Sequence, residues 1–160
     1  MIDFVFARDR MKASVVGALL LALAACAIIE PPPPRENPRD VVVDEALAQL
    51  DRPYRYRGAD PSGFDAAGLV YYVYQRVGLE LPAAALGQKA QGTSIAFDQL
   101  QRGDLVFYAR TEQPYPEPHV GIFVGRSRML HVPNQGSVQI ELINTPYWQR
   151  RFLDAVSYLP

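Results

Sequence analysis

The sequence predicts an α+β domain in which helices come first and an antiparallel sheet follows. Two observations support this prediction. Apolar residues recur at three- and four-residue steps between positions 41 and 77, whereas after position 104 they form short runs separated by Gly, Pro, Asn and Ser. The first spacing is typical of helices buried on one face, and the second of antiparallel strands. Helices and strands that are segregated along the chain favour α+β over α/β.

The helical spacing predicts two helices. The first covers Val41–Leu50, with Asp40 as its N-cap. The second follows the apolar positions in Leu69–Val77 and ends at the next residue, a glycine. Its candidate N-caps are Ser62 and Asp65, because both side chains can accept a hydrogen bond from a helix N–H group.

The second half of the chain predicts a central antiparallel sheet of about five strands. Each candidate strand is a short apolar or alternating run with turn-forming residues on either side. The five runs are Asp104–Ala109, His119–Val124, Met129–Val132, Val138–Ile143 and Leu153–Leu159.

A short apolar segment near the N-terminus predicts secretion. Ala13–Ala25 follows three basic residues and is shorter than the roughly 20 apolar residues of a membrane-spanning helix. The sequence Leu23–Cys26 resembles the bacterial lipobox, which predicts a lipoprotein signal peptide over residues 1–25, starting at Met1 or Met11. An ordinary signal peptide with a chance cysteine, or a buried helix, are the alternatives.

Cys26 is therefore expected to carry the lipid that holds the protein at a membrane. Residues 26–40 contain five prolines and predict an extended tether, which leaves residues 41–160 as the folded domain. Ala27 follows the lipidated position, and by resemblance to Gram-negative lipoproteins this predicts the periplasmic face of the outer membrane. A Gram-positive cell surface is the alternative.

Composition excludes several classes of protein. The chain has one cysteine and a formal net charge of -1. One cysteine cannot form a disulfide framework or a cysteine-rich zinc site, and the charge provides no basic surface for nucleic acid. We expect no cofactor, no metal and no nucleic-acid partner.

Two stretches, Pro53–Gly58 and Pro61–Val70, resemble the nucleophile region of the NlpC-type (NLPC/P-sixty) cell-wall peptidases. The resemblance continues through nearly all of the domain. Further matching segments are Leu100–Phe107, His119–Phe123, His131–Pro133 and Asn144–Phe152.

The resemblance implies a papain-like fold and a site built for cleaving peptidoglycan stem peptides. In such enzymes a cysteine at a helix start attacks a peptide carbonyl, a histidine takes its proton and a third polar group orients the histidine. Carried over by motif, His119 is the base, His131 is its orienting partner and Tyr56 is a hydroxyl that lines the site. Arg57 replaces a glycine common in the family, which puts a cationic side chain near the cleft.

The resemblance also implies that catalysis is lost. Ala66 stands where the nucleophilic cysteine is expected, and Ala67 replaces the serine that usually follows it. A methyl group cannot form an acyl-enzyme. Asp65 could be imagined as a substitute nucleophile, or as a metal ligand together with both histidines, but capping the helix is its simpler role.

The sequence therefore predicts an inactive domain that binds peptidoglycan stem peptide, or an envelope protein such as a wall hydrolase, without cleavage. An active endopeptidase with a relocated nucleophile or an activated water is the alternative. A purely structural envelope component is a third possibility.

Overall fold

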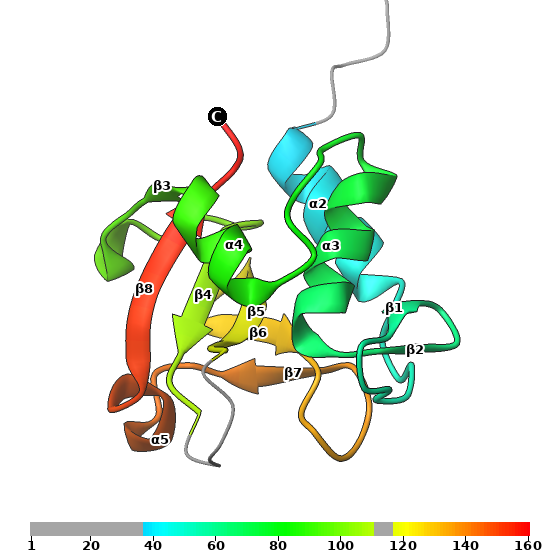
Figure 1. Cartoon of the computed structure of the whole chain (residues 1–160). Helices are drawn as coiled ribbons and strands as arrows, with labels where there is room; N and C mark the ends of the chain where they lie inside the picture. Colours follow the sequence, from blue (N-terminus) through cyan, green and yellow to red (C-terminus); the bar gives the residue numbers. More distant parts are fainter. Residues whose placement is uncertain (1–36, 111–116) are drawn as a thin grey trace, which may run out of the picture. The chain divides into compact units, whose positions relative to one another are not determined.

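The order of the elements confirms the predicted α+β fold (Figure 1). The computed structural model describes residues 37–110 and 117–160. The predicted signal peptide, the lipidation site Cys26 and residues 26–36 of the predicted tether lie outside the described residues. None of the helices in the described part is both long enough and apolar enough to cross a membrane.

Helix α2 covers Pro38–Leu47, so it begins and ends three residues earlier than predicted. The Asn37 side chain accepts a hydrogen bond from the Arg39 N–H at 3.0 Å, and proline fits the first helical turn because it has no N–H to leave unpaired. Asp40, predicted as the N-cap, lies inside the first turn instead. The last residues of the predicted tether are therefore helical.

Helix α3 covers Ala66–Arg76, and Asp65 rather than Ser62 is its N-cap. The Asp65 carboxylate accepts a hydrogen bond from the Gly68 N–H at 2.7 Å. Buried residues recur along the helix at three- and four-residue steps, so one face packs against the rest of the domain. These residues are Ala66, Leu69, Val70, Val73 and Tyr74.

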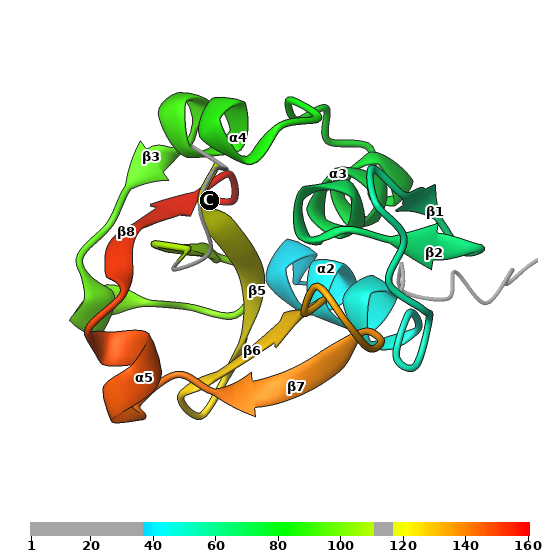
Figure 2. The same ribbon diagram turned by 60° about the horizontal axis from the view of Figure 1, so that its bottom comes forward.

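The sheet has six antiparallel strands in the order β3-β8-β4-β5-β6-β7, and it curves strongly (Figure 2). The five predicted strands are present, and the two-residue strand β3 adds a sixth by pairing with the end of β8. The strands are β3 (Thr93–Ser94), β4 (Leu105–Tyr108), β5 (His119–Gly125), β6 (Arg128–His131), β7 (Gln139–Leu142) and β8 (Phe152–Ser157).

Shorter elements surround this frame. A two-stranded hairpin precedes α3, a helix lies between α3 and β3, and a helical turn connects β7 to β8 on the far side of the sheet from α2 and α3 (Figures 1 and 2). They are β1 (Ala59–Asp60), β2 (Gly63–Phe64), α4 (Ala85–Gln91), the 3-10 turn η2 (Phe97–Gln99) and α5 (Pro146–Gln149).

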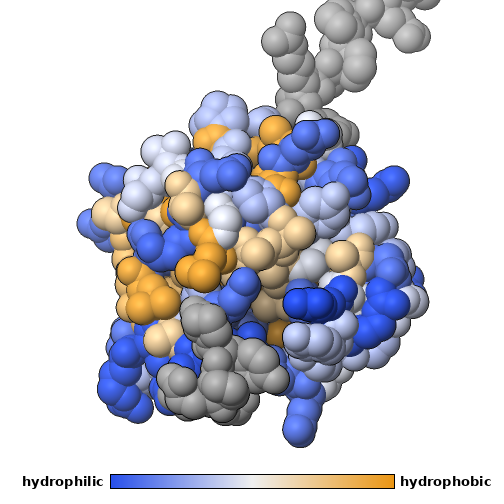
Figure 3. All heavy atoms as spheres, viewed as in Figure 1, coloured by the Kyte–Doolittle hydropathy of each residue, from blue (hydrophilic) through white to orange (hydrophobic). Residues whose placement is uncertain are grey.

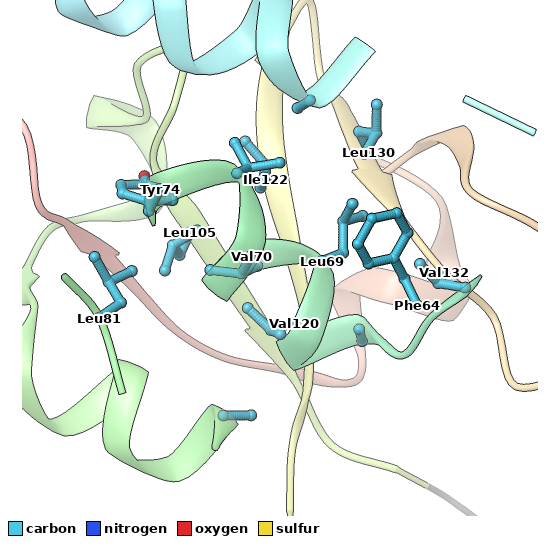
Figure 4. Close-up of a cluster of buried hydrophobic side chains, with 14 of the residues drawn as sticks. Phe64, Leu69, Val70, Tyr74, Leu81, Leu105, Val120, Ile122, Leu130 and Val132 are labelled. Atoms are coloured by element: carbon cyan, nitrogen blue, oxygen red, sulfur yellow. The ribbon is translucent and has the colours of Figure 1, made fainter. Parts of the chain in front are cut away.

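Successive side chains of a strand point to opposite faces, and strand β4 shows this directly. Leu105 and Phe107 enter the core beneath α2 and α3, whereas Val106 and Tyr108 enter a second cluster around Trp148 of α5. Figure 4 shows the first core, with the α3 side chains against those of β5 and β6. The sheet is therefore covered on both faces.

A buried ion pair fixes the start of α2 to the sheet. Arg39 Nη1 lies 2.7 Å from Asp104 Oδ1, and the Asp104 side chain is 1% exposed. The same guanidinium donates to the carbonyl groups of Arg102, Leu159 and Pro160. Arg39 therefore connects α2 to the C-terminal end of the chain.

Asp104→Ala should lower the free energy of unfolding by about 3 kcal/mol, because it leaves the Arg39 guanidinium buried without its anion. Chemical denaturation would measure the change. Arg76→Ala is the matched control: it removes an exposed ion pair with Glu45, at 3.6 Å, and should cost less than about 1 kcal/mol. Equal costs for the two variants would show that the buried pair does not anchor α2.

Candidate functional site

Three glycines fix the start of α3 against the β1–β2 hairpin. The Gly58 carbonyl accepts a hydrogen bond from the Asp65 N–H at 2.9 Å. A Cβ atom on Gly68 would lie 1.9 Å from that same carbonyl oxygen, and one on Gly58 would lie 2.2 Å from the Gly63 oxygen. Any side chain at these positions would push the helix away from the hairpin.

The helix start opens into a cavity of about 180 Å³. Tyr56, Asp65, Ala66 and Ala67 all line it, so the structure brings together four of the predicted site residues. Ala66 is 9% exposed and offers only a methyl group at the first position of the helix. Nothing at this position can act as a nucleophile.

A second cavity of about 640 Å³ adjoins the first. It shares Tyr56, Asp65 and Ala67 with the smaller cavity, and Arg57 and Tyr71 line it as well. The sequence-based expectation that Arg57 lies near the cleft agrees with this position. Together the two cavities form a groove along the start of α3.

The two predicted histidines form a buried pair. His119 begins β5, His131 ends β6, and the His119 Nε2 atom lies 2.8 Å from the His131 Nδ1 atom. The Trp148 ring stacks on His119 with 5.7 Å between the ring centroids. All three residues line a third cavity of about 250 Å³. The pair therefore lies on the face of the sheet that α5 covers.

Glu141 continues the histidine chain, and the sequence analysis missed it. One of its oxygens lies 3.5 Å from His131 Nε2, and the other accepts a hydrogen bond from Trp148 Nε1 at 3.0 Å. A carboxylate only accepts, so it favours a proton on His131 Nε2. The oxygen that lies near His131 also accepts a hydrogen bond from Gln139 Nε2, and His131 Nε2 has no hydrogen-bond partner among the described residues. With its proton on Nε2, His131 would accept at Nδ1 from His119 Nε2.

The histidine pair is neutral in the folded protein. Burial, the neighbouring His131 and the Arg110 guanidinium together lower the pKa of His119 from 6.5 to about 3. Burial also lowers the pKa of His131, and the Glu141 carboxylate opposes that shift. A base with a pKa near 3 has little affinity for a proton at neutral pH.

The predicted site residues fall into two groups. Among the cavities lined by residues 37–110 and 117–160, Ala66 and the histidines line neighbouring cavities rather than the same one. Arg110 and Asn134 line both, and the Arg110 guanidinium donates a hydrogen bond to Asn134 Oδ1. This contact lies at the junction of the two groups.

Asp65 acts as the cap of α3 and belongs to no metal-binding group among the described residues. Within residues 37–110 and 117–160, no three His, Cys, Asp or Glu side chains are grouped so as to hold a metal ion. The only cysteine of the chain is Cys26. The Asp65 carboxylate is engaged by the Gly68 N–H as a helix cap, the role that the sequence analysis favoured for it.

A sequence profile of the NlpC/P60 family matches residues 51–157, which contain the hairpin, α3, both histidines and Glu141. The chain belongs to the NlpC/P60 family. Murein DD-endopeptidase MepH of Escherichia coli is 35% identical over 120 residues, which are 72% of this chain and 44% of that protein. The chain thus spans less than half the length of this relative.

Solved structures of NlpC/P60 proteins share the fold. One from Bacillus cereus superimposes with a TM-score of 0.70 at 30% identity, covering 76% of this chain and 40% of that one. RipD from Mycobacterium tuberculosis, described as a non-catalytic NlpC/p60 domain protein adapted to peptidoglycan binding, has a TM-score of 0.65 at 28% identity. That match covers 78% of this chain and 99% of RipD.

The neutral histidine of this NlpC/P60 domain predicts a specific pH dependence. Between pH 6.5 and about 3, His119 takes up a proton in the unfolded chain but not in the folded one. Its contribution to stability is therefore fully present above pH 6.5 and is lost as the pH falls towards 3. In His119→Gln, the free energy of unfolding should change less steeply with pH than in the unsubstituted protein. The difference between the two slopes should reach up to about 1.4 kcal/mol per pH unit.

Urea denaturation at several pH values would measure both slopes. Subtracting the slope of the variant from that of the unsubstituted protein removes the contribution of the carboxylates that titrate in the same pH range. Identical slopes would show that His119 takes up its proton over the same pH range in the folded protein as in the unfolded chain, so that its pKa is not lowered by folding.

Proposed function

We propose that this chain is a catalytically inactive NlpC/P60 domain that binds a peptidoglycan stem peptide without cleaving it. One observation carries the proposal: the groove is formed and the histidine pair is in place, but Ala66 occupies the helix start where the family resemblance expects the nucleophile. The cysteine-peptidase mechanism implied by the family resemblance needs a thiolate at the start of this helix. A groove without a nucleophile can still bind the peptide.

The histidine pair supports the same conclusion. Without a thiol at residue 66, His119 has no nucleophile to deprotonate. An activated water would need a stronger base than an imidazole whose pKa is lowered to about 3. These points favour binding over the alternative of an endopeptidase that uses water.

The relatives support peptidoglycan as the ligand and suggest its form. RipD is described as adapted to peptidoglycan binding. A relative from Bacillus cereus, 30% identical over 122 residues, is a γ-D-glutamyl-L-lysine dipeptidyl-peptidase. We infer that the groove takes a stem peptide with a γ-linked glutamyl residue. A γ-linkage uses the side-chain carboxyl, so the α-carboxylate stays free.

The proposed place of action is the periplasmic face of the outer membrane. The lipobox resemblance at Cys26 and the prolines that follow it support a lipid anchor and a tether. A Staphylococcus aureus protein described as similar to a lipoprotein of this family has a TM-score of 0.71 at 27% identity, covering 89% of this chain and 48% of that one. Anchored there, the domain would face the cell wall.

Purified muropeptides should bind saturably and remain intact. The test uses the full chain carrying Cys26→Ser, in detergent, with calorimetry for binding and mass spectrometry of the mixture for cleavage. No new fragments are expected, because Ala66 cannot form the acyl-enzyme.

Other outcomes point to other functions. Fragments that disappear in His119→Ala would establish the endopeptidase alternative. An absence of binding, together with capture of a wall hydrolase from an envelope extract, would favour a protein partner instead.

Ala66→Cys should create a reactive thiol in the Cys26→Ser background. The helix start favours the thiolate, and a thiolate at residue 66 would in turn favour a proton on His119, which is neutral while residue 66 carries no charge. The pKa of the new thiol should therefore lie below the ordinary value of about 8.5. The rate of alkylation by iodoacetamide, measured against pH, gives this pKa.

The matched control is the double variant Ala66→Cys with His119→Ala, which keeps the helix start and removes the imidazole. Its thiol pKa should be closer to 8.5 than that of the single variant. The same alkylation profile in both variants would mean that His119 does not act on residue 66.

A further inference from the structure

Arg57 has a backbone conformation that residues with a Cβ atom rarely adopt. Its φ is 55°, in the left-handed region that favours glycine. Such conformations persist only where the surroundings impose them, and they cluster at functional sites. A glycine would adopt this conformation without strain. The arginine is therefore present although the backbone conformation at residue 57 is unfavourable for it.

The surrounding turn imposes this conformation. The Gly58 N–H donates to the Arg55 carbonyl at 2.8 Å and closes a turn with Tyr56 and Arg57 at its centre. Gly58 is itself packed against the Gly63 carbonyl, so the end of the turn cannot shift. Arg57 therefore cannot relax its backbone while α3 stays docked.

The turn aims Arg57 at the groove. Arg57 lines the cavity of about 640 Å³ together with Tyr56, and its Cζ atom lies 5.6 Å from the centroid of the Tyr56 ring. A guanidinium over an aromatic face is held in place while its N–H groups stay open to a ligand. The hydrophilic right-hand margin of Figure 3 lies over this hairpin.

The charges of the cavity leave Arg57 open to an anion. Asp65, Glu117 and Arg110 are the other charged residues that line the cavity, and each has a hydrogen-bond partner of its own. The two carboxylates accept from the Gly68 N–H at 2.7 Å and the Ala85 N–H at 3.2 Å, and the Arg110 guanidinium donates to Asn134 Oδ1. Among the described residues, no carboxylate forms an ion pair with Arg57. A carboxylate on the ligand would complement this charge.

We propose that the Arg57 guanidinium binds the free α-carboxylate of the γ-linked glutamyl residue, and that it selects the acid form of the stem peptide over its amide. This inference rests on the proposed function. A planar guanidinium pairs with a carboxylate through two parallel N–H···O bonds. A carboxamide has one oxygen and no charge, so it cannot form that pair.

The test compares two synthetic peptides, L-Ala-γ-D-Glu-L-Lys-D-Ala and the same peptide with its glutamyl α-carboxylate amidated. Calorimetry on the full chain carrying Cys26→Ser should show about tenfold tighter binding of the acid peptide, as expected for a charge-assisted pair. Arg57→Gly should remove this preference by weakening the acid peptide alone. Its melting temperature should stay the same or rise, because glycine adopts a positive φ freely.

Arg126→Gly is the matched control. Arg126 also has a positive φ, 52°, and is exposed, but it lies in the β5–β6 turn and lines none of the three cavities of the site. The substitution removes the same charge and relieves the same strain, and it should leave both affinities unchanged. A loss of preference in this variant would attribute the effect to net charge and overturn the inference.

The two proposals fail in different ways. Equal affinity for the acid and the amide peptides, unchanged in Arg57→Gly, would overturn the role of Arg57 and leave the binding function standing. If Arg57→Gly weakened both peptides equally and lowered the melting temperature, its role would be structural and the inference would also fall. If neither peptide bound the unsubstituted domain, the proposed function would fail and the inference with it.

Discussion

The site depends on how closely α3 can approach the hairpin before it. The Gly58 carbonyl oxygen accepts a hydrogen bond at the helix start and also faces Gly68, where a Cβ atom would lie only 1.9 Å away. This contact sets the position of the first helical turn and of the groove along it. It also fixes the turn that precedes Gly58, and with it the direction of Arg57. One backbone contact thus positions both sides of the proposed binding site.

Much of the fold follows from local patterns in the sequence. The five longer strands were predictable to within about two residues, because their alternation shows which side chains enter each core. Helix α4 escaped prediction since its N-cap, Ala84, makes no capping bond, and the helix is held instead by tertiary contacts of the buried Gln88. The start of α2 was misplaced because the Asn37 cap lies in a stretch whose prolines suggested a tether.

The site was predictable only as far as the family motifs reach. They located Ala66 at the helix start and identified His119 and His131, which the structure places in one hydrogen-bonded pair. They did not reveal Glu141, which reaches His131 through the pairing of β6 with β7. The alternation within β7 was the available signal, since it places Gln139 and Glu141 on one face. That alternation gives the face of Glu141 but not its partner, because the pairing of β7 with β6 is a long-range contact.

The cap of α3 has a consequence for the history of the protein. Asp65 caps the helix by accepting a hydrogen bond from the Gly68 N–H. The side chain of residue 66, the nucleophile position in the family, takes no part in that bond. A cysteine at residue 66 can therefore be replaced by alanine without loss of the hydrogen bond that caps the helix. Selection for a stable domain does not protect the nucleophile, so activity can be lost while the fold is inherited intact. The same independence means that a single substitution can place a thiol at residue 66 without disturbing the cap.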